Sequence, residues 1–216
     1  AAAQAELTGQ IVQVQAGKPL TMKFGNRQFQ LTFQGLGLSG KLVSAGNPSA
    51  TCGQKGIPLP QWQLADINPG SPGFKNTYGL DAFAGKKVVV ALVSDWCNSC
   101  RAQAQLMQKL QDQAIASGHS DVQMVLIADK AKSDPSQLIK QVKTIPIFQD
   151  TSAVNAWLKM NAAHAGKFAG SQIRNSGYGY AKSGKEIMYF APSGTGSLNL
   201  TAFQNAVMGV INAPDD

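Results

Sequence analysis

The chain has 216 residues, 44% of them hydrophobic, so it can bury a core and has room for one full domain with a smaller addition. Its net charge is +7, but the 19 Lys and Arg residues are spread from Lys18 to Lys185 without a dense cluster. Nucleic-acid binding needs a concentrated basic face, so we expect no nucleic-acid partner, whereas acidic partners or an anionic membrane surface stay open. The longest apolar run, residues 88–93, is too short to span a bilayer.

The first part of the chain has the patterns of β-strands. Apolar and polar residues alternate over residues 20–24 and again over residues 29–33. The turn sequence Gly25-Asn26-Arg27 lies between these two runs, which is typical of a β-hairpin.

The Gly-rich residues 35–40 and the polar residues 44–56 look like a boundary. We therefore predict a β-rich N-terminal extension over residues 1–50 and a main domain over residues 51–216. The extension either adds strands that pack on the main domain or serves as a docking surface for a partner.

From residue 57 onward the pattern alternates between strands and helices. Strands are expected at residues 62–64, 88–93, 122–128, 145–148, 178–181 and 187–190, and helices at 99–116, from 133, at 152–163 and at 200–211. The helix at 152–163 is expected to bury Val154, Trp157 and Leu158. This alternation predicts an α/β fold with a central mixed sheet flanked by helices.

Two cysteines stand at the junction of a buried strand and a helix, in the stretch Trp96-Cys97-Asn98-Ser99-Cys100. At this spacing the two sulfurs can face each other and close a disulfide. Cys97 is expected at the helix N-terminus, where unpaired N–H groups and the helix dipole favour a thiolate and lower its pKa. We interpret Cys97 as the attacking nucleophile and Cys100 as the thiol that resolves the mixed disulfide.

Other uses of this pair differ in how many further ligands they require. Covalent haem attachment is excluded because Arg101, and no histidine, follows the second cysteine. A zinc site would need two more ligands, for which Cys52, His119 and His164 are the candidates. Cu(I) bound by two thiolates, or an inert structural disulfide, also stays open, and we predict no resident cofactor or metal.

The stretch from Gly56 to Gln105 resembles the TlpA/ResA-like branch of thioredoxin-like proteins, which are exported thiol–disulfide oxidoreductases. Residues 57–66 look like the opening strand of that family, and Gly85-Lys86-Lys87-Val88 looks like its entry into the central strand. The cysteine pair then stands where the active site of the family belongs. The resemblance implies a thioredoxin-like fold and disulfide exchange with protein partners.

One departure from the family concerns a cis-proline that faces the dithiol. Pro146 lies at a suitable distance for a minimal thioredoxin, but a helix and a hairpin still follow it. The better alignment puts the family's proline position in Asn175-Ser176-Gly177, where no proline exists, as in selenoprotein-P-like domains. We therefore expect an N–H donor and extra room beside Cys97, weak general reductase activity, and Cu(I) or Zn(II) affinity in the reduced state. Ser176 and Gly177 are the predicted contacts for the backbone of a partner.

A second departure lies around the cysteines themselves. The dipeptide Asn98-Ser99 lacks the usual proline, and the preceding strand carries no carboxylate to move protons. Asp95 is the nearest acid and is expected to raise the pKa of Cys97.

Several further side chains have two interpretations each. Cys52 is either a third redox thiol or a buried free cysteine, and Tyr178 and Tyr180 can face either side of their strand. His119 and His164 are expected as solvated residues at helix ends. Trp62 and Trp157 are expected in the core, and Trp96 is expected to be exposed beside the dithiol as a contact for a partner.

Three functions are compatible with these sequence patterns. The first is an exported thiol–disulfide oxidoreductase, periplasmic or secreted; the first residue is Ala1, which suits a mature form after signal-peptide removal. The second is a non-catalytic thioredoxin-like module that docks through residues 1–50. The third is a Cu(I)-handling protein that uses the same thiols.

Overall fold

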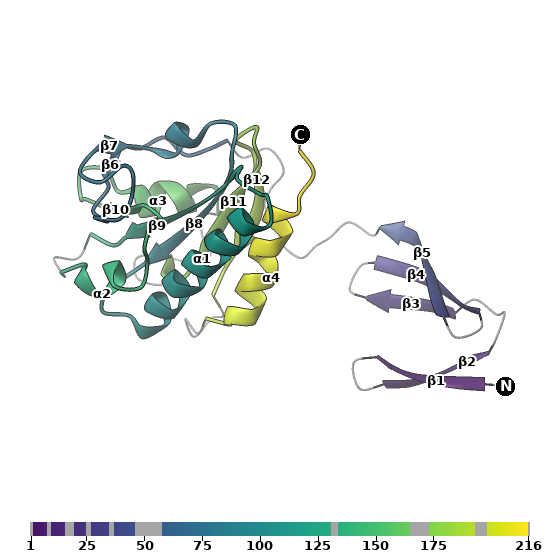
Figure 1. Cartoon of the computed structure of the whole chain (residues 1–216). Helices are drawn as coiled ribbons and strands as arrows, with labels where there is room; N and C mark the ends of the chain where they lie inside the picture. The colour runs from purple at the N-terminus through teal and green to yellow at the C-terminus, as the bar shows by residue number, and fades with distance from the viewer. Residues whose placement is uncertain are drawn as a thin grey trace. The chain divides into compact units, whose positions relative to one another are not determined.

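The computed structural model describes residues 2–7, 10–15, 20–24, 27–34, 37–45, 58–130, 134–164, 173–192 and 198–215. Cys52 lies outside these residues. The chain divides into two compact units, Ala1–Ala50 and Thr51–Asp216, and each is considered by itself (Figure 1).

The N-terminal unit consists of antiparallel strands. Its elements are β1 (Ala2–Leu7), β2 (Gln10–Gln15), β3 (Leu20–Phe24), β4 (Arg27–Gln34) and β5 (Gly37–Ala45). The predicted hairpin is present, because β3 pairs with β4 and Phe24 lies opposite Arg27. Residues 37–45, which include part of the Gly-rich stretch, form β5, and β5 pairs along β4 as the third strand of this sheet.

A five-stranded mixed sheet forms the centre of the second unit, in the order β10-β9-β8-β11-β12. Its strands are β8 (Lys87–Val93), β9 (Val122–Ala128), β10 (Ile147–Gln149), β11 (Gly177–Tyr180) and β12 (Glu186–Phe190). The first three run parallel to one another, and β11 runs antiparallel to both β8 and β12. Every residue of β8 is buried, as expected for a central strand covered on both faces.

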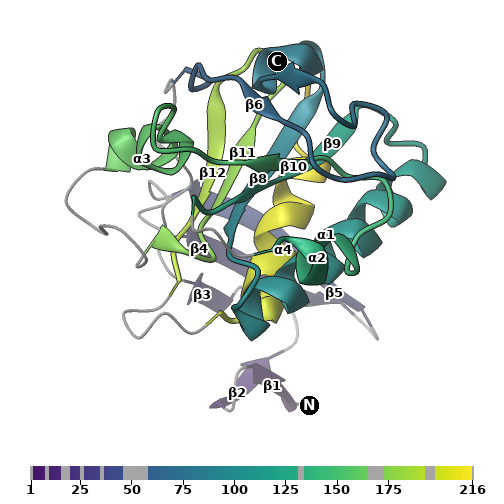
Figure 2. The same cartoon turned by 90° about the vertical axis from the view of Figure 1, so that its left-hand side faces the viewer.

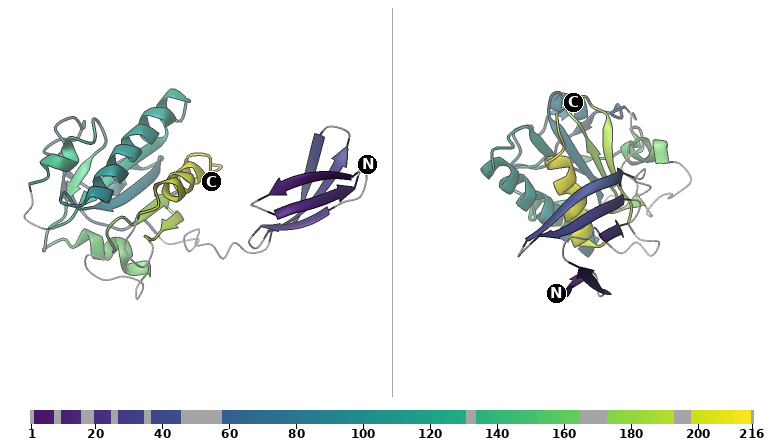
Figure 3. Two further views of the ribbon diagram at one scale, coloured as in Figure 1. Left: turned by 90° about the horizontal axis from the view of Figure 1, so that it is seen from below. Right: turned by 90° about the vertical axis from the view of Figure 1, so that its right-hand side faces the viewer.

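Helices cover the two faces of this sheet. On one face α1 (Asn98–Ala116) and α4 (Leu200–Ile211) lie side by side over Val89, Ala91 and Val93 (Figures 1 and 2). The opposite face, with Val88, Val90 and Leu92, is covered by α3 (Ala156–Asn161) and the short strands β6 (Leu64–Ala65) and β7 (Thr77–Tyr78). The smaller elements are η1 (Leu80–Phe83), α2 (Ser136–Ile139) and η2 (Ala162–His164). Figure 3 shows the helix pair from below. None of the described helices is long and apolar enough to cross a membrane.

The helix predicted over residues 152–163 begins later than its pattern indicates. Asn155 has a left-handed backbone (φ 51°), which ends the preceding turn, and the Asp150 carboxylate then accepts the N–H of Ala156 at 2.8 Å. This upstream cap rotates the helix so that Trp157 faces the core and Leu158 is 53% exposed. The prediction that Leu158 is buried was wrong for this reason.

Buried glutamines interrupt the apolar stripe of α1. Gln111 donates to the carbonyl of Val122 and accepts the N–H of Met124, which ties α1 to β9. Gln108 accepts the N–H of Lys143 at 2.8 Å in the segment before β10. These glutamines satisfy backbone groups that water would otherwise have to reach.

An aromatic cluster lies on the other face of the sheet. Tyr178 and Tyr180 are both fully buried there. His164 stacks on Tyr189 with ring centroids 3.7 Å apart, and its Nε2 lies 3.0 Å from Oε1 of Glu186. The expectation of a solvated His164 was therefore wrong.

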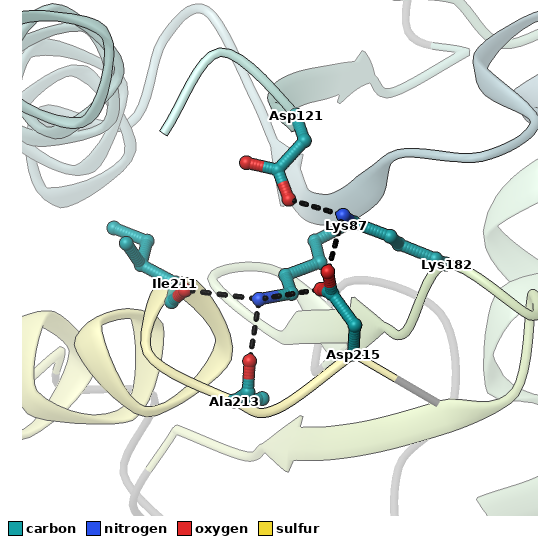
Figure 4. A network of polar contacts seen from close by, with 6 residues as sticks. All are labelled: Lys87, Asp121, Lys182, Ile211, Ala213 and Asp215. Atoms are coloured by element: carbon teal, nitrogen blue, oxygen red, sulfur yellow. Dashed lines mark hydrogen bonds and ion pairs between the residues drawn. The ribbon is translucent and has the colours of Figure 1, made fainter. Parts of the chain in front are cut away.

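A buried lysine fastens the chain after α4. Lys87 Nζ donates to the carbonyls of Ile211 and Ala213 and pairs with Asp215 at 3.4 Å (Figure 4). Lys182 bridges Asp215 and Asp121 at 2.8 Å each. Positive charge at a helix C-terminus complements the free carbonyls and the helix dipole.

Two glycines of β11 allow α4 to pack directly on the strand. A Cβ at Gly177 would lie 2.6 Å from Phe203, and one at Gly179 would lie 2.5 Å from Val210 and 2.9 Å from Met188. These distances are shorter than any van der Waals contact, so the contact between α4 and β11 depends on the absence of side chains.

We expect Gly179→Ala to lower the free energy of unfolding by about 1–3 kcal/mol, because the added methyl group overpacks the contact with α4. The matched control is Gly209→Ala, which adds the same methyl group to an open site in α4. That control should gain up to about 1 kcal/mol from helix propensity. Urea unfolding of both variants measures the difference, and equal effects would contradict the packing argument.

Candidate active site

The end of β8 leads within four residues into α1. Cys97 is the N-cap of α1: its backbone is extended (φ −94°, ψ 114°), and its Sγ accepts the N–H of Cys100 at 3.3 Å. A sulfur thus takes the place of the hydroxyl or carboxylate oxygen that usually satisfies a free N–H at a helix start. The predicted position of Cys97 at the helix N-terminus is confirmed.

Both thiols are free and mostly covered, with Cys97 8% and Cys100 0% exposed. The dithiol therefore lies largely beneath the surface of the domain. Cys100 lies one turn inside α1 among core residues such as Ala104 and Val93. Neither cysteine lies within a strand. Because Cys100 is fully buried, Cys97 is the only one of the two thiols that solvent reaches.

The pKa of Cys97 is lowered to about 5. The largest cause is a hydrogen bond from the Cys100 side chain, which burial partly opposes. The Ser99 hydroxyl, the N–H of Cys100 and the charge of Arg174 lower the pKa further. Cys97 is therefore a thiolate at neutral pH.

The other thiol shifts in the opposite direction. Burial first, and then the hydrogen bond to Cys97, raise the pKa of Cys100 well above its ordinary value. Asp95 does not raise the pKa of Cys97 as we expected; its carboxylate accepts the N–H of Leu138 at 2.9 Å. The pair thus consists of one thiolate and one protonated thiol.

Asn175, which enters β11 next to the end of β8, contacts both thiols. Its Nδ2 donates to Cys100 Sγ at 3.3 Å, and its Oδ1 lies 3.8 Å from Cys97 Sγ. The same Oδ1 lies 3.1 Å from Oγ of Ser99, whose one hydroxyl proton can turn to this oxygen or to Cys97 Sγ. The backbone of Asn175 is left-handed (φ 67°), a conformation that asparagine tolerates better than most residues.

Gln103 of α1 sets the orientation of this amide. Its Nε2 donates to the backbone carbonyl of Asn175 at 3.2 Å, and its Oε1 accepts Nδ2 of Asn175 at 3.0 Å. Because both contacts are satisfied in one arrangement, Asn175 turns its N–H toward Cys100 and its oxygen toward Cys97. Sequence reasoning missed both roles, although an asparagine directly before the strand beside the dithiol was a usable signal.

No family model matches the chain, and no curated protein matches its sequence. Its structure matches a thiol:disulfide interchange protein of the thioredoxin family from Chlorobium tepidum, with a TM-score of 0.54 and 15% identity over 74% of this chain and 99% of that one. The thioredoxin domain of a thiol-disulfide oxidoreductase from Bacteroides vulgatus matches at 0.53 and 15%, over the same shares. A secreted thiol-disulfide isomerase from Corynebacterium glutamicum matches at 0.53 and 14%, over 85% and 99%. The fold is thioredoxin-like.

In this thioredoxin-like frame, the segment that faces the dithiol is the one that enters β11. Pro146 precedes β10, which β9 separates from β8, and no peptide bond among the described residues is cis. Asn175, in the segment Asn175-Ser176-Gly177, is the residue of this entry to β11 that contacts both thiols.

The expected N–H donor and extra room beside Cys97 are not found. The N–H of Ser176 donates to the carbonyl of Ile173 at 3.1 Å, and the N–H of Asn175 donates to that of Leu92 at 2.8 Å. The Asn175 side chain occupies the space instead. The side chain of Ser176 is fully buried, and Gly177, which has no side chain, packs against Phe203. Neither residue therefore presents a side chain to a partner.

Trp96 is 56% exposed directly before the nucleophile, as predicted. The guanidinium of Arg174 lies over its ring, 4.2 Å from the centroid. Of the candidate zinc ligands, His164 is bound to Glu186, and the described residues contain no group of three His, Cys, Asp or Glu side chains that could hold a metal ion.

We expect the alkylation rate of Cys97 by iodoacetamide to rise with a midpoint near pH 5, because the rate follows the thiolate. Ser99→Ala removes one hydrogen bond to Cys97 and should move the midpoint to higher pH. The double variant Cys52→Ser/Cys100→Ser keeps a donor beside the sulfur and leaves Cys97 as the only cysteine, so it serves as the background for this measurement. A midpoint near that of a free thiol, about 8.5, would contradict the assignment of Cys97 as nucleophile.

Proposed function

We propose that this chain is an exported thiol–disulfide oxidoreductase that exchanges a disulfide between Cys97 and Cys100 with protein partners. The observation that carries the proposal is a thiolate at the helix N-terminus with a protonated thiol one turn behind it. Proteins with this fold in Bacteroides vulgatus and Corynebacterium glutamicum are named a thiol-disulfide oxidoreductase and a secreted isomerase, which supports both the chemistry and the export.

The first step forms a mixed disulfide. The thiolate of Cys97 attacks one sulfur of a partner disulfide, a bond forms between Cys97 and that sulfur, and the old S–S bond breaks. The other sulfur of the partner leaves as a thiolate and takes a proton from solvent.

The second step releases the partner. Cys100 gives its proton to solvent and attacks Sγ of Cys97, and the first sulfur of the partner leaves as a thiolate. The chain is then oxidised by two electrons and the partner is reduced by two. The same steps in reverse oxidise a dithiol in a partner.

Mixed-disulfide formation itself prepares Cys100 for the second step. Once Cys97 is bonded to the partner, it no longer carries the negative charge that helps to raise the pKa of Cys100. Two effects on the pKa of Cys100 then oppose each other. Burial raises it, whereas the hydrogen bond from the side-chain N–H of Asn175 to Sγ stabilises the thiolate and lowers it. Asn175 is thus a positioning residue for the resolving thiol.

Contact with the partner is proposed through Trp96, an exposed aromatic side chain directly before the nucleophile. Ser176 and Gly177 could contribute through their backbone alone, because both are buried. The strand before the dithiol, β8, contains no carboxylate, so protons are exchanged with solvent rather than through an acid in that strand.

We expect the reduced protein to reduce insulin disulfides, and Cys97→Ser to abolish that activity. Cys100→Ser should instead accumulate a mixed disulfide with the substrate, because the attack that resolves it is lost. Insulin turbidity and non-reducing electrophoresis measure the two outcomes. If the wild type is inactive and Cys100→Ser traps no partner, the chain is a non-catalytic module.

Asn175→Ala should slow the resolving step about tenfold, since one hydrogen bond to a charged group is lost. Gln103→Ala should act in the same direction through the orientation of Asn175. Gln105→Ala is the matched control, because this exposed glutamine lies on the same helix away from the core. Stopped-flow decay of a preformed mixed disulfide measures the step, and a purely structural role would leave its rate unchanged in correctly folded variants.

A further inference from the structure

A cation and an aromatic ring stand together at the edge of the dithiol. Trp96 directly precedes the nucleophile Cys97, and Arg174 directly precedes Asn175 on the facing segment. The Arg174 guanidinium lies 4.2 Å from the ring centroid of Trp96, within the range of a cation–π contact. Two segments far apart in the sequence therefore build one exposed surface beside the reacting sulfur.

The guanidinium of Arg174 has no hydrogen-bond or ion-pair partner among the residues that the structure describes. The other basic residue of the site differs, because Arg101 donates to the carbonyl of Asp95 at 3.0 Å and to Oδ1 of Asn98. Arginine presents five N–H donors in a plane that matches a carboxylate. Arg174 thus offers donors that no described residue uses.

Two acids that follow β8 and β9, Asp95 and Asp129, each accept a hydrogen bond from another part of the domain. The Asp95 carboxylate accepts the N–H of Leu138, and the Asp129 carboxylate accepts the hydroxyl of Ser94. The charge of Arg174 also acts on the Cys97 thiolate, which indicates that the two groups are close. A net charge of +7 further favours acidic partners over basic ones.

We propose that Arg174 and Trp96 form a carboxylate-recognition site that selects protein disulfides with an acidic residue beside the reacting cysteine. The inference rests on the proposed exchange function. The acidic side chain binds the guanidinium while Cys97 attacks the neighbouring sulfur, and the indole ring holds the guanidinium in place.

The test uses three synthetic peptide disulfides that are identical except for Asp, Asn or Lys next to the cysteine. Exchange is followed at pH 7.5, where Cys97 is a thiolate, and each rate is divided by that of the same peptide with dithiothreitol to remove intrinsic differences. The wild type should prefer the Asp peptide over the Asn peptide, and the Lys peptide should be slowest. Added salt should reduce the preference.

Arg174→Gln should lower the Asp-to-Asn rate ratio about threefold to fivefold, the effect of one partly exposed ion pair. Arg101→Gln is the matched control: it also removes one positive charge near the dithiol, but both terminal nitrogens of Arg101 already donate to Asp95 and Asn98, so the ratio should stay high. An unchanged ratio in Arg174→Gln, or an equal loss in both variants, would overturn the proposal.

A binding measurement separates this inference from the function on which it rests. Non-reactive peptides, with Ser in place of Cys, are titrated into the protein, and binding is followed by the quenching of tryptophan fluorescence. The part of the quenching that is lost in Trp96→Phe belongs to Trp96. Tighter binding of the Asp peptide than of the Lys peptide supports the site even where no peptide exchanges its disulfide. Absence of exchange with all peptides contradicts the oxidoreductase proposal, whereas equal binding of all three contradicts the carboxylate site.

Discussion

The hydrogen bond from the N–H of Cys100 to Sγ of Cys97 is the contact on which the site depends. It ends the loop after β8, begins α1 and fixes the distance between the two sulfurs in a single geometry. The same bond, together with the hydrogen bond from the Cys100 thiol, stabilises the thiolate of Cys97 and so lowers its pKa. A side chain with no acceptor at residue 97 would therefore remove a helix cap as well as a nucleophile.

Around this contact the structure combines an apolar core with a short chain of amides. Gln103 holds Asn175, and Asn175 reaches both thiols, so the orientation of one buried side chain is passed to the reacting atoms. The backbone of Asn175 is itself tied to Leu92 of β8. Movement of either β11 or α1 would change the environment of Cys100 directly.

The sequence alone predicted β8, α1 and the dithiol between them. The apolar run of residues 88–93 and the apolar stripe through Met107 and Leu110 are strong local patterns. It did not show Gln103 as a core residue, since a polar side chain on a helix is ordinarily taken for the solvated face. The contact between Gln103 and Asn175 joins residues 72 apart, and no local period records such a pairing. The same limit applies to α3, whose start depends on Asp150 outside the helix.

The chain of amides is electrically neutral at every pH that a folded protein meets. A carboxylate in the place of Asn175 would gain and lose a proton as its surroundings acidified, and the reactivity of Cys100 would follow that second titration. Here the side chains hydrogen-bonded to Cys100 Sγ are an amide and the other thiol. No carboxylate among the described residues is hydrogen-bonded to Cys97 Sγ either. Above the pKa of Cys97, the attack of its thiolate on a disulfide is therefore expected to have a flat pH profile.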